Sequence, residues 1–194
     1  MDNYHWPKTF WELFEDGRDA YRAGRRDAAT MFDAKQKQFL AGLGASAAEI
    51  FDFVEDNFRG GDPGFETVLL ITAARRDYFL TVQRGQPSAK VIDMAALPSK
   101  GAMLEGLEWL PRIIEKARAK LRGEMPPELM YCCGGDRAFL RDHGIHPADF
   151  LREVWAAKED TKRMVDFVRN SAIHRPAEVP GAVCEILPGG RVKC

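Results

Sequence analysis

The most constraining feature of the sequence is an amphipathic segment that runs from Leu110 to Gly123. At 100° per residue, its apolar side chains fall within about a third of the helical circumference and its basic side chains lie along the two flanks. Pro111 suits the first turn of a helix, and Gly123 suits the position just after one. The segment is therefore predicted to be a helix whose apolar stripe must be covered by other elements.

Similar signals recur earlier in the chain. Apolar residues at helical spacing predict helices over about 7–23 and 25–43. Ser46 and Glu49 have the spacing of a capping box and predict the start of a third helix. The expected buried stripe of that helix is Ile50, Phe51, Val54 and Phe58.

Residues 65–84 allow two interpretations. Asp62 and Pro63 can supply an N-cap and a first-turn proline, and Gly85 suits a C-terminus, so the ends favour one deeply buried helix. The β-branched and aromatic residues would also suit a strand pair with its turn at 75–77. The helix is preferred because the signals at both ends agree with it.

Two segments precede the central helix. Residues 86–100 contain prolines and little periodicity, which predicts a surface loop. Residues 101–110 are expected to be helical, and Pro111 then either begins a new helix or kinks a continuous one.

Shorter helices are predicted after the central one. The GGD turn at 134–136 opens the first of them, which ends at Gly144. The next begins at Pro147 with His146 as its N-cap, and the last spans about 160–171.

The C-terminal tail, residues 179–194, has the pattern of a small β-hairpin. Its register would set Cys184 opposite Cys194 and Glu185 opposite Lys193. An isolated hairpin of this size is marginally stable, so it must pack on something else or fray.

The composition fits a globular fold, since 45% of the residues are hydrophobic and 29% are charged. The expected fold class is mainly α: a compact multi-helix domain with a small C-terminal β-hairpin. We expect a single helical domain over residues 1–178, in which the N-terminal helices of residues 1–100 precede a core at 101–172.

Charge and hydropathy argue against several partners and locations. The formal net charge is −1, and neither half of the chain has the large basic excess that nucleic acid or an anionic membrane would recruit, so neither is an expected partner. The chain lacks a secretory pattern and an apolar run of ~18 residues, so a cytoplasmic location is expected. The cysteines lack Cys-x-x-Cys spacing, so a structural metal is not expected, although a metal site assembled across the fold stays open. No cofactor is expected.

A series of motifs follows in fixed order between residues 101 and 172. They are LPRIIEKARAKLRG, Tyr131, GGDRAFL, Gly144-Ile145 and DFLREVW. In this order they resemble the bacterial family catalogued as domain of unknown function 5069. The resemblance implies a small, mainly helical intracellular domain and supplies no reaction. Residues 1–100 lie outside it.

The glycine-flanked acidic turn is the first candidate site. Gly134 and Gly135 allow close backbone approach, and the first N–H groups of the following helix can bind an anion. Asp136 is then a candidate catalytic residue and Arg137 a candidate ligand-binding residue. The plain structural alternative is that Asp136 caps the helix and Arg137 forms a surface pair.

Cys133 is a second candidate, because a thiol near a helix N-terminus can ionise and act as a nucleophile. His143 or His146 would serve as its base, and Tyr131 would contact the ligand. Alternatively, Cys133 is a small buried residue packed beside Tyr131.

Arg75 and Arg76 adjoin a very apolar segment, where buried charge must be paired or face a cavity. They either line a pocket for an acidic ligand or pair with Asp56, Asp62 or a C-terminal carbonyl. Arg112 and Lys116 would close the same pocket from the other side.

For Arg112 and Lys116 the alternative is the solvated basic flank of an amphipathic helix.

Three functions remain open. The first is a pocket for a small anionic molecule, with acid–base chemistry, bounded by Arg75, Arg112, Tyr131, Cys133, Asp136 and Arg137. The second is a non-catalytic interaction module or homodimer formed through the aromatic-rich N-terminal helices. The third is a redox or metal-responsive protein that uses Cys132, Cys133, Cys184 and Cys194.

Overall fold

The computed structural model describes residues 3–173, 185–187 and 191–193. Helices dominate this part of the chain, which confirms the mainly α fold class. The α-helices, in chain order, are α1 (Trp6–Arg22), α2 (Ala28–Met31), α3 (Ala34–Gly42), α4 (Ala47–Gly60), α5 (Phe65–Thr81), α6 (Leu110–Arg122), α7 (Gly134–Asp142), α8 (Pro147–Ala157) and α9 (Thr161–Ile173). The remaining elements are the 3-10 helix η1 (Met94–Ala96) and the strands β1 (Met103–Leu104), β2 (Leu107–Glu108), β3 (Glu185–Leu187) and β4 (Arg191–Lys193).

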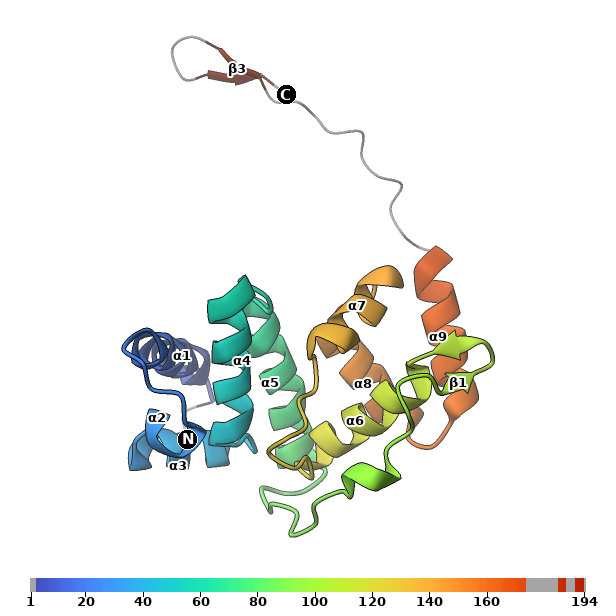
Figure 1. Cartoon of the computed structure of the whole chain (residues 1–194), viewed down its shortest axis with the longest axis horizontal. Coiled ribbons are helices and arrows are strands. Elements are labelled where there is room, and N and C mark those ends of the chain that lie inside the picture. The colour runs from blue at the N-terminus through green and yellow to red at the C-terminus, as the bar shows by residue number, and fades with distance from the viewer. Residues whose placement is uncertain (1–2, 174–184, 188–190, 194) are drawn as a thin grey trace.

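The helices form two groups that meet at α5 and α6. Figure 1 shows α1 to α5 on one side and α6 to α9 on the other, with α5 in contact with both α6 and α8. Most buried apolar residues of both groups belong to one hydrophobic cluster, which extends from Trp6 to Val168. Among the described residues, no helix has the length and apolar character needed to cross a bilayer.

The interpretation of residues 65–84 as a helix is confirmed by α5. The predicted N-cap is wrong, however, because α5 begins at Phe65 after Gly64. The carboxylate of Asp62 instead pairs with Arg137, which lies on α7. A cap residue was expected there because Asp-Pro is a common helix start, and the distant arginine was not visible in the local pattern.

The single helix expected over 25–43 is wrong, because the chain forms α2 and α3 with a break between them. Phe32 is extended, with a ψ of 140°, and Asp33 starts α3. The Asp33 carboxylate accepts the backbone N–H of Gln36 at 2.8 Å, and the Gln36 side chain accepts the backbone N–H of Asp33 at 2.9 Å. This capping box satisfies donors that a new helix would otherwise leave unpaired.

The helix expected over 101–110 is also wrong. These residues form the antiparallel hairpin of β1 and β2. Glu105 and Gly106 have φ values of 47° and 82°, the left-handed conformation that both central residues of a type I′ turn adopt. Pro111 therefore lies in the first turn of a new helix, α6, rather than kinking a longer one.

The start of α4 is confirmed, but its buried stripe differs from the expected one. Ser46 Oγ accepts the backbone N–H of Glu49 at 3.2 Å. Phe53, which the prediction left out, is fully buried, as are Ile50 and Val54, whereas Phe58 is 40% exposed. Phe51 and Phe58 instead lie against the ring of Tyr21, with centroids 6.1 and 5.0 Å away.

The predicted short helices correspond to α7, α8 and α9. His146 caps α8 by accepting the backbone N–H of Ala148 at 3.2 Å, as expected. In the tail, β3 and β4 pair with Glu185 opposite Lys193, which confirms the predicted register. Cys184 and Cys194 lie outside the described residues.

Gly135 allows Trp109 to pack against the start of α7. A Cβ atom at Gly135 would lie 2.5 Å from Cζ2 of Trp109, which is closer than real contacts permit. At Gly134 the nearest heavy atom to an added Cβ is Nη2 of Arg137, at 4.0 Å. The two adjacent glycines therefore differ in what a methyl group would disturb.

We expect Gly135→Ala to lower the free energy of unfolding by about 1–3 kcal/mol, because the methyl group must displace the Trp109 ring. Gly134→Ala is the matched control, since it adds the same methyl group in open space. Urea denaturation of the two variants measures the difference. Equal stabilities would show that the tryptophan ring adjusts freely.

Candidate functional site

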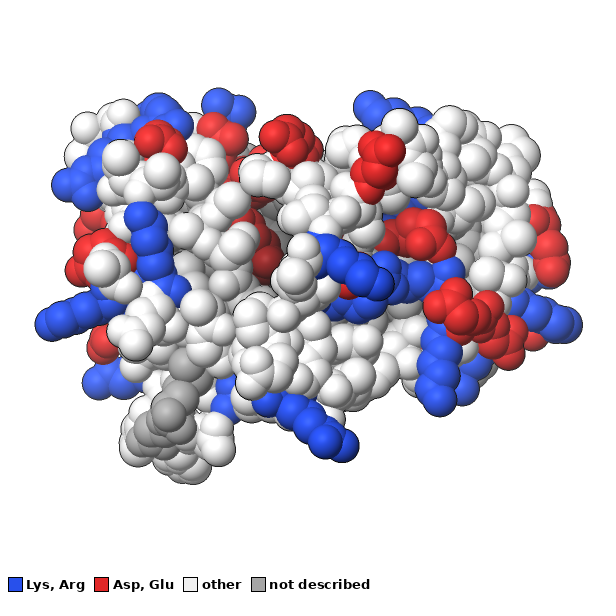
Figure 2. Space-filling model, turned by 90° about the horizontal axis from the view of Figure 1, so that it is seen from below, with Lys and Arg blue, Asp and Glu red and all other residues white. Residues whose placement is uncertain are grey.

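A cavity of about 460 Å³ lies between the two groups of helices. Its walls come from the end of α3, the start of α4, the middle of α5, the end of α6 and the loops at 87–91 and 125–131. The lining is largely apolar but includes charged side chains, namely Glu49, Asp52, Arg75 and Lys120. Figure 2 shows a hollow on the lower side of the molecule that contains acidic side chains and is surrounded largely by uncharged residues.

Arg75 is a buried cation in this cavity, with 2% of its surface exposed. Its Nη1 donates to Oε1 of Gln83 at 2.7 Å, and its guanidinium lies 5.2 Å from the ring centroid of Phe79. Within the described residues it forms no ion pair, and its Nε has no hydrogen-bond acceptor. Burial lowers the pKa of Arg75 to about 10.

Two glycines make room for this guanidinium. A Cβ atom at Gly123 would lie 2.5 Å from Nη2 of Arg75, and one at Gly44 would lie 3.0 Å from its Cζ. Both glycines have positive φ values, 68° and 71°, which other residues adopt at a cost. The turns that end α3 and α6 therefore also shape the cation site.

Lys120 is the second buried cation, with 1% of its surface exposed. It forms an ion pair with the carboxylate of Glu49, and its Nζ lies 5.5 Å from the ring centroid of Phe53. Burial lowers the pKa of Lys120 to about 7. Glu49 thus has two roles, since its backbone N–H completes the cap of α4 and its carboxylate crosses to α6.

Asp52 and Tyr131 are two further polar residues of the wall. Burial, followed by repulsion from Glu55 and Asp56, raises the pKa of Asp52 to about 6. The Tyr131 hydroxyl donates to the backbone oxygen of Pro147 at 2.8 Å, and burial raises the pKa of Tyr131. The hydroxyl therefore holds the first turn of α8 against the loop that carries Tyr131.

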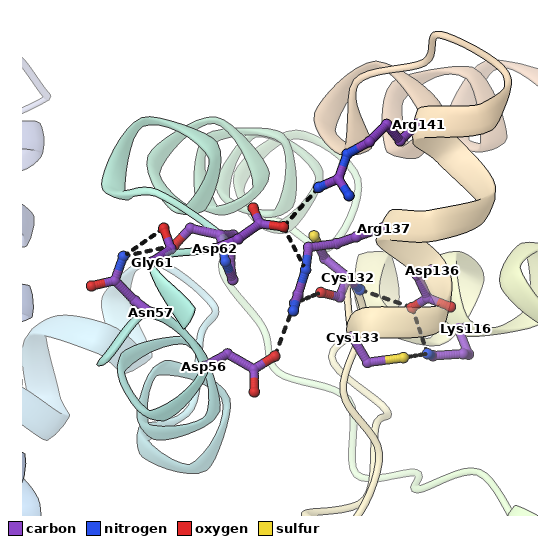
Figure 3. A network of polar contacts seen from close by, with 11 residues as sticks. Asp56, Asn57, Gly61, Asp62, Lys116, Cys132, Cys133, Asp136, Arg137 and Arg141 are labelled. Carbon is purple, nitrogen blue, oxygen red and sulfur yellow. Dashed lines mark hydrogen bonds and ion pairs between the residues drawn. The ribbon is translucent and has the colours of Figure 1, made fainter. Parts of the chain in front are cut away.

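A separate polar network surrounds Asp136, whose side chain is completely buried. Its Oδ2 accepts from Nζ of Lys116 at 2.5 Å and from the backbone N–H of Cys132 at 2.9 Å, contacts that Figure 3 shows. Its Oδ1 accepts the indole N–H of Trp109 at 2.9 Å. The carboxylate therefore joins α6, α7 and the loop before α7.

The vicinal cysteines adjoin this network in different ways. Cys133 is half-buried, and its Sγ lies 3.2 Å from Nζ of Lys116. Cys132 is fully buried, and burial raises the pKa of its thiol to about 12. Of the two thiols, Cys133 is thus the one in hydrogen-bond contact with the Lys116 ammonium.

Arg137 connects this network to the N-terminal helices. It pairs with Asp56 at 2.9 Å and with Asp62 at 3.0 Å, and it donates to the backbone oxygen of Cys132 at 2.6 Å. Figure 3 shows the guanidinium between α4 and the loop before α7. The carboxylates that the sequence offered as partners for Arg75 and Arg76 therefore bind Arg137.

The structure divides the predicted site residues among separate places. Arg75 and Tyr131 line the cavity, whereas Cys133, Asp136 and Arg137 belong to the network around Lys116. The remaining two are elsewhere: Arg112 donates to the backbone oxygen of Pro98 at 2.6 Å, and His143 Nδ1 lies 2.8 Å from the backbone oxygen of Phe139.

Sequence reasoning missed Glu49, Asp52 and Lys120 as cavity residues. The interpretation of Lys116 as part of a solvated basic flank is wrong, because only 2% of its surface is exposed, and Lys120 four residues later is equally buried. The spacing of the two lysines was the available signal. Residues four apart lie on one face of a helix, and lysines buried on that face would need acidic partners there.

Among the described residues, no group of three or more His, Cys, Asp or Glu side chains is placed to hold a metal ion.

These features define a helical protein with a charged cavity beside a buried ion-pair network. Residues 95–186 match the family model described as Domain of unknown function (DUF5069), so this part of the chain is similar to that family. No curated protein and no solved structure matches the chain. Lys116, Lys120 and Asp136 fall inside the matched region, whereas Glu49 and Arg75 precede it.

We expect Asp136→Asn to lower the free energy of unfolding by about 3–5 kcal/mol, because it leaves the Lys116 ammonium buried without a counter-charge. Asp166→Asn is the control, because its pair with Lys162 is exposed and screened by solvent, so its loss should change the stability little. Chemical denaturation measures both losses. Adding Lys116→Met to Asp136→Asn should recover part of the stability, because it removes the unpaired ammonium. Similar losses of stability for Asp136→Asn and Asp166→Asn would contradict a structural role for the buried pair.

We expect the stability of the protein to depend on pH through Asp52, whose pKa rises from 3.8 to about 6 on folding. The folded state then holds the proton more tightly than the unfolded chain, so this group's contribution to stability falls as pH rises through about 4 to 6. Asp52→Asn lacks this loss and should gain stability relative to the wild type between pH 4 and about 7. Urea denaturation across this range, with Asp166→Asn as control, tests the expectation. A constant difference between Asp52→Asn and wild type would refute it.

Proposed function

We propose that the cavity binds a small anionic molecule and that Arg75 provides the positive charge that holds it. The observation that carries this proposal is the burial of the Arg75 guanidinium in the cavity wall without an ion pair among the described residues. Burying a charge is costly unless a counter-charge or hydrogen bonds compensate for it. A carboxylate or phosphate could supply both, since a guanidinium binds such groups through paired N–H donors.

Among the charged side chains of the cavity wall, Arg75 is the cation that is available to bind an anion. Glu49 is already paired with Lys120, so its carboxylate does not compensate the guanidinium. The carboxylate of Asp52, whose pKa burial raises to about 6, is still largely ionised at neutral pH, but among the described residues it forms no ion pair with Arg75. Arg75 is therefore the cation of the cavity wall that has no ion pair within the described residues.

The size and lining of the cavity suit a small organic anion. A volume of about 460 Å³ falls within the range of small-molecule pockets, roughly 300–1,000 Å³. Apolar side chains, including Met125, Leu129 and Met130, offer contact to the body of a ligand whose charged end lies at Arg75. This combination of an apolar wall and few polar groups is typical of ligand sites.

The acid–base role predicted for Asp136, Cys133 and His143 draws no support from this geometry. Asp136 is fully buried and its carboxylate is occupied by three donors. We therefore propose ligand binding at the cavity and assign no reaction to the network around Lys116.

Thermal melting and calorimetry with a panel of small carboxylates and inorganic phosphate test the proposal. At least one compound should raise the melting temperature of the wild type, and Arg75→Gln should weaken its binding by roughly 10–100-fold, the equivalent of about 1.5–3 kcal/mol for a charged hydrogen bond. Arg75→Lys, which keeps the charge, should retain part of the affinity.

Arg76→Gln is the matched control, because Arg76 is also buried on α5 but bonds Asn3 and faces the ring of Trp6 instead of the cavity. Its affinity for the same compounds should equal that of the wild type. A panel that produces no shift, or equal binding by Arg75→Gln and wild type, would show that the cavity is not an anion site.

A further inference from the structure

We infer that Lys120 is a reactive amine, which forms an imine with the carbonyl group of a short oxo acid bound in the cavity. This inference rests on the proposed function and names a substrate class for it. The carboxylate of the oxo acid would bind Arg75, and its carbonyl carbon would face Lys120, since both cations line the same cavity.

The surroundings of Lys120 differ from those of the other buried lysine on α6. Lys116 is held by Asp136 and Cys133 and does not line the cavity. Lys120 lies one turn further along the helix, lines the cavity, and has a single carboxylate partner, Glu49, among the described residues. The two lysines therefore have separate roles, one in the fold and one at the cavity.

The groups that face Lys120 suit an amine that loses its proton near neutrality. Burial lowers its pKa to about 7. Cys132, in the loop before α7, would raise that pKa only if its thiol ionised, and burial keeps this thiol neutral. Glu49 from α4 favours the ammonium, as does Asp52, which is largely ionised at pH 7 because its pKa is about 6, whereas Arg75 from α5 disfavours it. Lysines activated in this way are the amines that form Schiff bases.

The chemistry needs only groups that already line the cavity. Glu49 accepts a proton from the Lys120 ammonium, and the freed lone pair attacks the carbonyl carbon to form a carbinolamine. Glu49 then returns the proton to the carbinolamine hydroxyl, which leaves as water while the nitrogen forms the protonated imine. The net change joins one ammonium and one carbonyl into one iminium and one water, with no oxidant or reductant.

Reductive trapping tests this inference on the unaltered protein. The wild type is incubated with glyoxylate or pyruvate, reduced with cyanoborohydride, and mapped by peptide mass spectrometry. Lys120 should be the main labelled residue at pH 7, with labelling at least roughly tenfold above that of exposed Lys90, because an ordinary lysine has a pKa of about 10.4. Its labelling rate should rise through pH 7 and then level off.

Variants and a neutral probe separate the parts of the site. Lys120→Arg should abolish the main adduct, whereas Lys90→Arg, which alters an exposed lysine outside the cavity lining, should not. Arg75→Gln should slow labelling by glyoxylate more than labelling by propionaldehyde, which has no carboxylate. The peptide map of the wild type remains decisive if Lys120→Arg does not fold.

Adducts confined to exposed lysines would overturn the inference. If carboxylates still bind in an Arg75-dependent way in that case, the anion site stands and the imine alone is refuted. If there is neither carboxylate binding nor labelling of Lys120, both proposals fail.

Discussion

The buried ion pair between Lys116 and Asp136 is the interaction on which the C-terminal half of the structure depends. Both side chains are almost wholly removed from water, with 2% and 0% exposed. Such a pair is stable only when further hydrogen bonds satisfy the carboxylate, and here Trp109 and the backbone of Cys132 supply them. One carboxylate therefore sets the positions of α6, α7 and the loop between them.

The cavity follows from this arrangement. Because Lys116 is fixed on α6, Lys120 one turn later points toward the start of α4, where Glu49 meets it. The loop before α7 brings Tyr131 to the same wall. The N-terminal helices complete the wall with Arg75, so the cavity needs residues on both sides of the boundary at residue 95, where the family match begins.

Local patterns predicted most helices well, because a helix start depends on residues within one turn of each other. The Ser46 and His146 caps and the glycine end of α6 are examples. The errors arose where two local signals competed. Over 25–43 the helical spacing of apolar residues predicted one helix, although the capping box at Asp33 starts a new one. Over 101–110 a helix was expected where Glu105 and Gly106 form a turn.

What can be read from the amino-acid order alone is most of the helices, the glycine and proline positions that end or begin them, and the family resemblance of the second half. Which charges are buried, and which carboxylate each one meets, followed from the packing of distant elements. Asp62 binds Arg137 and Glu49 binds Lys120, partners 75 and 71 positions away in the chain. Periodicity places a side chain on a face of its own helix, but the identity of the facing group depends on how the helices pack.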